Sequence, residues 1–188
     1  MGGGMRRTTQ WGLAALLAMA AMSAGAAPAR GRIVKPMPGP HPEIREGEVY
    51  HGQVTDVVGG DIVYITRDDH AHMITTLSEA DAPEQGQPYA QAAQNFLSRL
   101  LSRKQVTVQV MEVAPHKMVK VRLWVGNTDV VYAMLANGYA WLQLLDTTPS
   151  TYLEAQTNAQ QAHRGLWADA EPEDPAKWRQ EHMIGINR

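Results

Sequence analysis

The chain has 188 residues, contains no cysteine and carries a formal net charge of −2 at pH 7. It therefore has no disulfides and no thiol-anchored lipid, and its folding must rest on a hydrophobic core alone. A strongly basic composition would indicate a nucleic-acid-binding protein, whereas this mildly acidic one does not. The length leaves room for one domain of ordinary size with additional segments.

Residues 1–26 have the pattern of a secretory signal peptide. Arg6 and Arg7 precede the apolar run 11–22, and the small residues 24–26 fit a cleavage site. The run is too short to span a bilayer about 30 Å thick, although an uncleaved anchor is the alternative. We therefore expect export to the periplasm or beyond, with no stable membrane insertion after cleavage. Cleavage would remove two arginines and no acid, which changes the net charge from −2 to −4.

Residues 27–45 are predicted to form a proline-rich tether. The segment has almost no hydrophobic periodicity and contains five prolines, at positions 28, 36, 38, 40 and 42. Such a composition favours an extended, semi-rigid chain. The folded domain is expected over residues 46–182, followed by a tail at 183–188.

Five strands are predicted where apolar residues alternate with polar ones. The short turn Asp68-Asp69 is expected to join the second and third strands as a hairpin. The strands are expected at about 46–58, 61–67, 70–77, 105–111 and 120–125.

Three helices are predicted from apolar residues at helical spacing. The first covers 88–102, with Pro88 in its first turn, and the second covers 131–137 and ends at Gly138. The third covers 151–163, where Thr151 and Glu154 have the spacing of a capping box. An early meander followed by helices favours an α+β fold, a five-stranded barrel of the OB type carrying three helices.

Three carboxylates are candidates for one site. Asp81 and Glu84 lie three residues apart just before the first predicted helix, and Asp61 follows a Gly-Gly turn. Converging carboxylates are typical of a site that holds a hard divalent cation beside a general base.

Over residues 47–179 the chain resembles the staphylococcal nuclease-like (thermonuclease) family. The resemblance rests on six short segments taken in order: Gly59-Gly60-Asp61, Asp81-Ala82-Pro83-Glu84, Gln87-Pro88-Tyr89, Asn137-Gly138-Tyr139-Ala140-Trp141, Arg164-Gly165-Leu166-Trp167 and Trp178-Arg179. It implies an OB-fold with three helices. It also implies a Ca²⁺-dependent enzyme that hydrolyses DNA and RNA phosphodiesters with a glutamate base and two arginine clamps.

The same resemblance implies roles for individual residues. Asp61 and Asp81 match the metal-binding aspartates, and Ala82 matches a residue that contributes its backbone carbonyl to the metal. Glu84 matches the base that activates the attacking water. Oxygen ligands of this kind bind Ca²⁺ at about 2.3–2.6 Å.

The chain departs from the family pattern at the arginine positions, which are occupied by Thr76 and Met118. In the opening turn, Gly59 and Ile62 replace a carboxylate and a hydroxyl. Removing one preorganised hydrogen-bond donor, such as one of these arginines, typically lowers the rate of catalysis by about 10²–10³. Lys117 and Lys120 are the candidate substrate-binding replacements. Arg67 and Arg122 are the other cations considered, and lysine is not equivalent to arginine at a bidentate site.

We therefore predict a degenerate, monomeric member of the family that acts as a binding or interaction module or a very weak nuclease. Ca²⁺ binding is expected to be weak or absent. The expected partner is single-stranded nucleic acid or a protein of the cell envelope. The alternative is an active Ca²⁺-dependent endonuclease with Glu84 as its base, and a third possibility is a purely structural role for the carboxylates.

Two further hypotheses concern other side chains. His70 and His72 lie on one face of a strand, where they are either a transition-metal site or exposed residues without a ligand. A nucleic-acid groove is the other hypothesis, and its plainer alternative is a solvated basic face with the aromatic rings in the core. Its candidate residues are Arg99, Arg103, Lys104, Lys117, Lys120, Tyr89, Tyr139 and Trp141.

Overall fold

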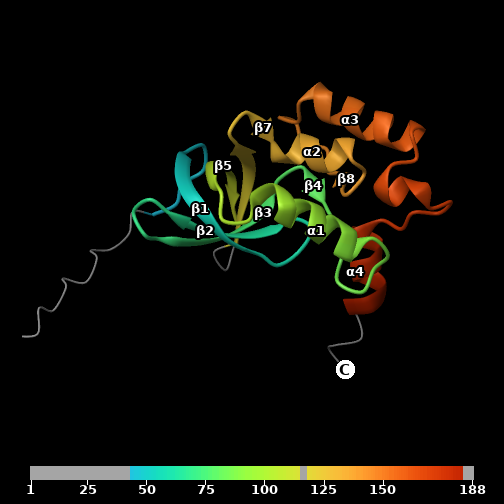
Figure 1. The fold of residues 1–188 in the computed structure, drawn as a ribbon, viewed down its shortest axis with the longest axis horizontal. Coiled ribbons are helices and arrows are strands. Elements are labelled where there is room, and N and C mark those ends of the chain that lie inside the picture. Colours follow the sequence, from blue (N-terminus) through green and yellow to red (C-terminus); the bar gives the residue numbers. More distant parts are fainter. Residues whose placement is uncertain (1–42, 115–117, 184–188) are drawn as a thin grey trace, which may run out of the picture. The chain divides into compact units, whose positions relative to one another are not determined.

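The structure, a computed structural model, describes residues 43–114 and 118–183. The described part contains a β-barrel, several short strands and four α-helices (Figure 1). The strands that form the barrel are β1 Val49–Val57, β2 Ile62–Arg67, β3 His72–Leu77, β5 Gln105–Val113 and β6 Met118–Val125.

The barrel closes through a pairing between its third and last strands. Its order is β3-β2-β1-β5-β6, and β3 also pairs with β6 in parallel, whereas the other barrel pairs are antiparallel. A short strand, β7 (Thr128–Asp129), extends the sheet beside β6. The five-stranded, OB-like barrel expected from the alternating segments is thus confirmed, including the turn at Asp68-Asp69 that joins β2 to β3.

The inward side chains of the strands fill the barrel with branched aliphatic residues. Successive side chains of a strand point to opposite faces, so one apolar set lines the interior. In β5 the inward set is Val106, Val108 and Val110, and each is at most 3% exposed. This core supports the helices that lie beside the barrel.

Helix α1 (Ala90–Leu101) packs against the barrel through Ala93, Leu97 and Leu101, which are fully buried at a spacing of four residues. The helix begins at Ala90, so Pro88 precedes it rather than lying in its first turn as predicted. Tyr89 has a φ of 67° at the helix N-cap, because the chain turns sharply there from the loop into the helix.

Helices α2 (Val130–Ala136) and α3 (Ser150–Gln161) pack on each other. The predicted capping box is wrong, because α3 begins at Ser150 with Pro149 as its N-cap and has no side-chain capping bond. The segments that follow the two helices meet at Gly138, whose carbonyl accepts the Leu166 N–H at 2.8 Å. A Cβ on Gly138 would lie 2.1 Å from the Arg164 carbonyl oxygen, so only glycine permits this approach.

The prediction of three helices is corrected by a fourth, α4 (Pro175–Met183), which follows the 3₁₀ turn η2 (Gly165–Ala168). Its sequence has no apolar stripe from which it could have been predicted, and Lys177, Glu181 and His182 are exposed. A second small sheet pairs β4 (Ala80–Asp81) with β8 (Trp141–Leu142). None of the helices within the described ranges is long and apolar enough to cross a membrane.

Candidate functional site

The fold brings Asp61, Asp81 and Glu84 together from three segments. Asp61 directly precedes β2, Asp81 ends β4, and Glu84 lies in the loop that leads to α1. The carbonyl of Asp61 accepts the Leu77 N–H at 3.0 Å, which fixes the start of β2 against the end of β3. The arrangement agrees with the convergence expected from the sequence.

Gly60 allows the turn before Asp61 to pack closely on the site. A Cβ at this position would lie 2.5 Å from the Cβ of Ala82 and 2.9 Å from that of Ala93. A Cβ on the neighbouring Gly59 would meet no atom closer than 3.6 Å. The first glycine of the pair is therefore replaceable on steric grounds, and the second is not.

The Asp61 carboxyl group is in an unfavourable electrostatic environment. Its burial, followed by the charges of Asp81 and Glu84, raises its pKa to about 7. Two hydrogen bonds oppose this shift, one from the Thr76 hydroxyl at 3.4 Å and one from the backbone N–H of Ala82. Without a cation beside it, this group therefore carries only part of its charge at neutral pH.

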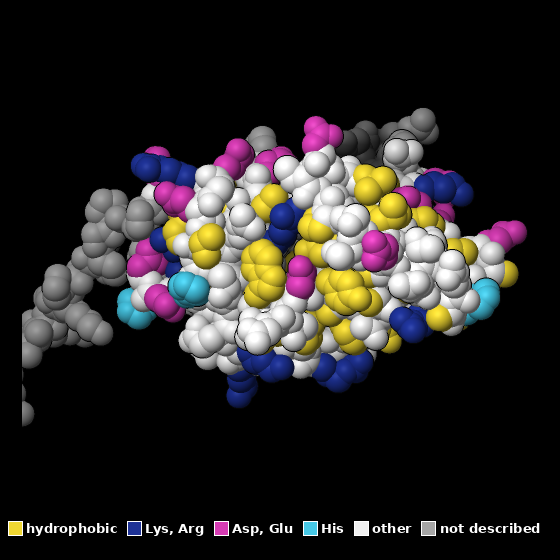
Figure 2. Space-filling view, turned by 90° about the horizontal axis from the view of Figure 1, so that it is seen from above, with side chains coloured by type: hydrophobic (Ala, Val, Ile, Leu, Met, Phe, Trp, Pro, Cys, Tyr) yellow, Lys and Arg dark blue, Asp and Glu magenta, His cyan; other side chains and the backbone are white. Residues whose placement is uncertain are grey.

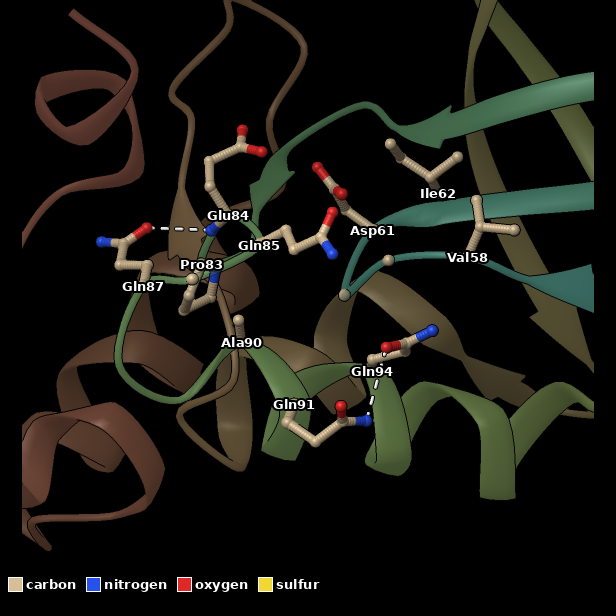
Figure 3. A pocket seen from close by; sticks show the side chains of 13 residues that line it. Val58, Asp61, Ile62, Pro83, Glu84, Gln85, Gln87, Ala90, Gln91 and Gln94 are labelled. Carbon is tan, nitrogen blue, oxygen red and sulfur yellow. Dashed lines mark hydrogen bonds between the residues drawn. The ribbon is translucent and has the colours of Figure 1, made fainter. Parts of the chain in front are cut away.

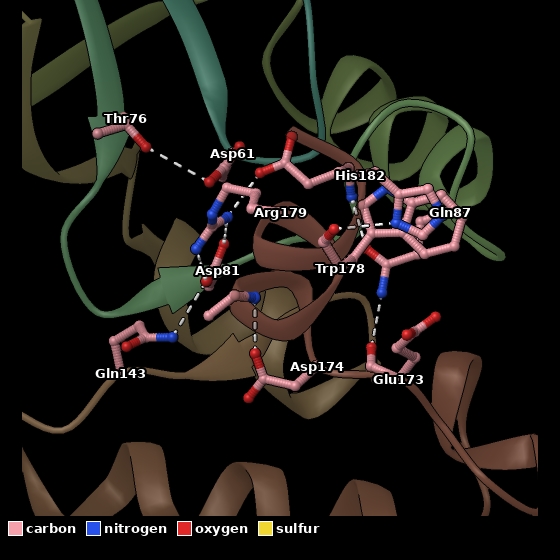
Figure 4. A network of polar contacts seen from close by, with 12 residues as sticks. Asp61, Thr76, Asp81, Gln87, Gln143, Glu173, Asp174, Trp178, Arg179 and His182 are labelled. Atoms are coloured by element: carbon pink, nitrogen blue, oxygen red, sulfur yellow. Dashed lines mark hydrogen bonds and ion pairs between the residues drawn. The ribbon is translucent and has the colours of Figure 1, made fainter. Parts of the chain in front are cut away.

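An arginine from the last helix pairs with the other two carboxylates and offsets one of their two negative charges. Arg179 Nη1 donates to Asp81 Oδ1 at 2.9 Å and to Glu84 Oε1 at 2.5 Å, while Nη2 donates to Asp81 Oδ2 at 2.7 Å. Figure 4 shows the Arg179 side chain between those of Asp61 and Asp81. Hydrogen bonds to Asp81, in particular, raise the pKa of Arg179 further above its ordinary value.

A divalent cation does not fit this arrangement while Arg179 is in place. Both oxygens of Asp81 accept hydrogen bonds from Arg179, and Oδ2 also accepts one from Gln143 at 3.1 Å. Among the described residues, no three His, Cys, Asp or Glu side chains are grouped so that they could hold a metal ion. The carboxylate chemistry suits Ca²⁺, but the guanidinium uses the oxygens that the cation would need.

The two positions predicted to lack the family's arginines lie on β3 and β6. Thr76 pairs with Lys120 across these strands, and Met118 pairs with Ile74, one step further along the same face. Met118 is 40% exposed. Neither side chain supplies a cation near the carboxylates.

Of the two candidate lysines, Lys120 lies at the site and Lys117 falls outside the described residues. Lys120 helps to line a hollow of about 280 Å³, together with Asp61, Thr76, Asp81 and Arg179. Its Nζ donates to Glu112 Oε2 at 2.7 Å, in an exposed ion pair. Lys120 is thus a cation at the edge of the hollow, and it is already paired with Glu112.

The remaining arginines considered as replacements serve other purposes. Arg122 Nε donates to the buried Glu79 at 2.8 Å, and its Nη2 donates to the Thr147 carbonyl at 2.7 Å. Arg67 binds Asp69 at 2.8 Å and is not among the residues that line the hollow. Both guanidinium groups are structural ion-pair partners.

A second hollow, of about 530 Å³, lies on the other side of Asp61, between the Gly59-Gly60 turn and α1 (Figure 3). Four glutamines line it, and the amides of Gln87 and Gln94 form hydrogen bonds to neighbouring segments. Gln87 accepts the Glu84 N–H at 2.9 Å and donates to the Glu173 carbonyl at 2.7 Å. This bracing holds Glu84 in position and ties its loop to the segment before α4.

The aromatic residues suggested for a nucleic-acid groove pack against other aromatic rings. The ring of Tyr139 packs on Phe96 at 4.8 Å between centroids, and Trp141 packs on Trp167 at 4.6 Å. Tyr89 packs against the same tryptophan cluster. On the face shown in Figure 2, hydrophobic side chains occupy the middle and the basic ones lie mainly toward its edges. The candidate cations Arg99, Arg103 and Lys104 are exposed, and none of them lines either hollow beside the carboxylates.

The two histidines are separated by the shape of the hairpin. His70 has a φ of 69° in the turn, whereas His72 is the first residue of β3 and its Nδ1 lies 3.0 Å from the Thr66 hydroxyl. Neither belongs to a three-ligand group within the described segments.

Arg179 lies at the carboxylates, and no sequence pattern predicted this position for it. The pair Trp178-Arg179 contributes to the family resemblance, but no helical periodicity places it near the carboxylates. Asp81 and Arg179 are 98 positions apart, and only the path of the chain through α2, α3 and η2 brings α4 back to the site.

Comparisons with known proteins identify the family of the chain. A family model described as staphylococcal nuclease homologue matches residues 73–169, just over half of the chain. An uncharacterized endonuclease of Haemophilus influenzae is 28% identical over 134 residues, covering 71% of this chain and 75% of that protein. A micrococcal nuclease of Shigella flexneri is 26% identical over 151 residues, covering 73% and 85%. The rice protein named probable staphylococcal-like nuclease CAN3 is 32% identical over 102 residues, covering 54% of this chain but only 27% of its own length.

Proposed function

The chain belongs to the staphylococcal nuclease family, and on that premise we propose that it is a degenerate member that does not hydrolyse phosphodiesters efficiently. Its carboxylates remain, but the guanidinium groups that would bind the phosphoryl oxygens are missing. The domain then acts as an exported binding or interaction module of the cell envelope.

One observation carries this proposal: the guanidinium at the candidate site and that of Arg122 are both already paired with carboxylates. Arg179 binds Asp81 and Glu84, and Arg122 binds Glu79. No other arginine among the described residues lines the hollow beside Asp61 and Asp81. A phosphodiester in that hollow would therefore have no unpaired guanidinium group from which to accept two parallel hydrogen bonds.

The expected loss of rate follows from general magnitudes. Removing one preorganised donor to a developing negative charge typically costs about 10²–10³ in rate. Two such donors are absent, at Thr76 and Met118, and partial additivity would leave very little hydrolysis. Lys120 does not restore the clamp, because an ammonium is a point charge and this one is paired with Glu112.

The alternative function is an active Ca²⁺-dependent endonuclease with Glu84 as general base. The convergence of Asp61, Asp81 and Glu84 favours it, since a structural role alone does not require three neighbouring acids. In that case Ca²⁺ would be held by Asp61, Asp81 and the backbone carbonyl of Ala82. The ion would polarise the phosphodiester, while Glu84 would accept the proton of the attacking water.

Restoring the missing arginines tests the proposal. Cleavage of single-stranded DNA and of RNA is measured with Ca²⁺ and with chelator for the purified protein and for the Thr76→Arg, Met118→Arg double variant. We expect little Ca²⁺-dependent cleavage by the wild type and a rise of at least tenfold in the double variant. Efficient wild-type cleavage that is lost in Glu84→Gln would refute the proposal and establish the alternative.

Binding is measured separately from cleavage. Fluorescence anisotropy with a labelled oligonucleotide, at low and at physiological salt, shows whether single-stranded nucleic acid is the partner. Binding that disappears as salt is raised would indicate only nonspecific phosphate contacts. In that case the search moves to a protein of the cell envelope.

A further inference from the structure

Helix α4 has little apolar contact with the rest of the domain. Of its side chains from Pro175 to His182, only Pro175 is buried, and the outer face consists of charged or polar residues. Trp178 is half-buried, stacks on His182 with 3.7 Å between ring centroids and lies beside Gly86. Such a helix gains little from the hydrophobic effect, so its position must depend on polar contacts.

The principal polar anchor within α4 is Arg179. Its guanidinium group makes three hydrogen bonds, two to Asp81 and one to Glu84. The side chain of Asp81 is only 9% exposed in its ion pair with Arg179. The other ion pair of the helix joins Lys177 to Glu181 at 3.7 Å, both on α4 itself and both more than half exposed. That pair cannot attach the helix to the barrel. Gln87 holds the segment before α4 through the Glu173 carbonyl, and the ion pairs that hold α4 itself are made to the carboxylates of the candidate site.

A divalent cation and Arg179 would compete for the same oxygen atoms. Both oxygens of Asp81 and one of Glu84 accept from the guanidinium. These oxygen atoms cannot bind a divalent cation and the guanidinium at the same time, because the Coulomb repulsion between two cations so close together is large.

We propose that Arg179 is the resident cation of this site and that α4 is a latch. The helix is attached while the guanidinium pairs with Asp81 and Glu84, and it is released when a divalent cation takes those carboxylates. The site thereby couples the position of the C-terminal helix to the local concentration of divalent cation. The proposal does not depend on hydrolysis, since it concerns only which cation the carboxylates hold.

The coupling has a measurable size. A ligand that binds only the released state has its apparent affinity reduced by the fraction of molecules in that state. If α4 is attached in about 90–99% of molecules, removing Arg179 should tighten Ca²⁺ binding by about 10- to 100-fold. Arg179→Gln keeps a polar side chain of similar length but removes the charge.

Two measurements on the purified protein test the latch. Calorimetric titration with CaCl₂ gives the affinity, and hydrogen exchange of residues 175–182 reports whether α4 is attached. For the wild type we expect weak Ca²⁺ binding accompanied by faster exchange in α4. For Arg179→Gln we expect fast exchange without Ca²⁺ and binding tighter by at least tenfold.

Matched variants separate the latch from general charge effects. Lys177→Gln removes one positive charge from the same helix without touching the carboxylates, and it should behave as the wild type in both measurements. Asp81→Asn should release α4 without creating a Ca²⁺ site. The proposal is overturned if Arg179→Gln binds Ca²⁺ no more tightly than the wild type, or if saturating Ca²⁺ leaves the exchange of α4 unchanged.

Discussion

Replacement of Arg122 by methionine should destabilise the protein strongly, because it leaves a buried charge without its partner. Glu79 is fully buried, and Arg122 is 14% exposed in the pair that they form. The change removes the Nε bond of 2.8 Å, a second bond to the same Glu79 oxygen and the bond to the Thr147 carbonyl. Glu79 Oε2 already has no hydrogen-bond partner, so nothing remains to compensate its charge.

The expected loss in the free energy of unfolding is about 3–5 kcal/mol, which is the usual cost of removing one partner from a buried ion pair. Urea unfolding followed by tryptophan fluorescence gives this value directly. Adding Glu79→Gln to Arg122→Met removes the buried charge, and the double variant should regain more than half of the loss.

The control is Lys120→Met, on the same strand and face as Arg122. Its ion pair with Glu112 is exposed on both sides, so the loss should stay below about 1 kcal/mol. A loss of less than 1 kcal/mol in Arg122→Met, with no recovery in the double variant, would refute the structural assignment. Arg122 would then again be a candidate for binding a phosphate.

Two further predictions concern the turn that carries the first carboxylate. In chelator, Asp61→Asn should raise the free energy of unfolding by about 1–3 kcal/mol at pH 8 and by much less at pH 4. The folded wild type keeps the proton of the Asp61 carboxyl group up to about pH 7, whereas the unfolded chain releases it near pH 4. The stability of the wild type therefore falls as the pH rises from about 4 to about 7. Equal gains at pH 4 and pH 8 in urea unfolding would contradict this prediction. Gly60→Ala should cost about 1–3 kcal/mol through overlap with Ala82 and Ala93. Gly59→Ala should cost less than 1 kcal/mol in the same assay, and a reversed order would show that the turn packs differently.

The barrel could be predicted because its strands carry a local signal. Inward valines such as Val106 and Val108 alternate with polar residues, and this alternation indicates a half-buried strand whatever the rest of the chain does. The same holds for α1, whose Ala93 and Leu97 recur at helical spacing. Closure through the parallel pair β3–β6 joins distant segments and has no such local signature.

The elements that were missed are short or lack periodicity. β4 and β8 have two residues each and exist only because the loops before α1 and after α2 pass side by side. Helix α4 has no apolar face. The capping box failed because Pro149 placed the start of α3 one residue earlier, at Ser150, so Thr151 lies inside the helix.

The acidic residues of the candidate site could be predicted from the sequence, but the arginine that pairs with them could not. Asp81 and Glu84 are neighbours in sequence, and the glycines before Asp61 mark a turn, so their convergence could be expected. The position of Arg179 depends on the whole path from β4 to α4, which no short pattern encodes. This missing contact determines whether the carboxylates are available to a metal ion.

The most direct test of the central claim is the single-turnover rate of single-stranded DNA cleavage by the wild type and by Glu84→Gln in saturating Ca²⁺. We expect the two rates to agree within about tenfold, because a site without its arginines gains little from the base. A wild-type rate that is 10³-fold or more above that of Glu84→Gln, and that is abolished by chelator, would contradict it.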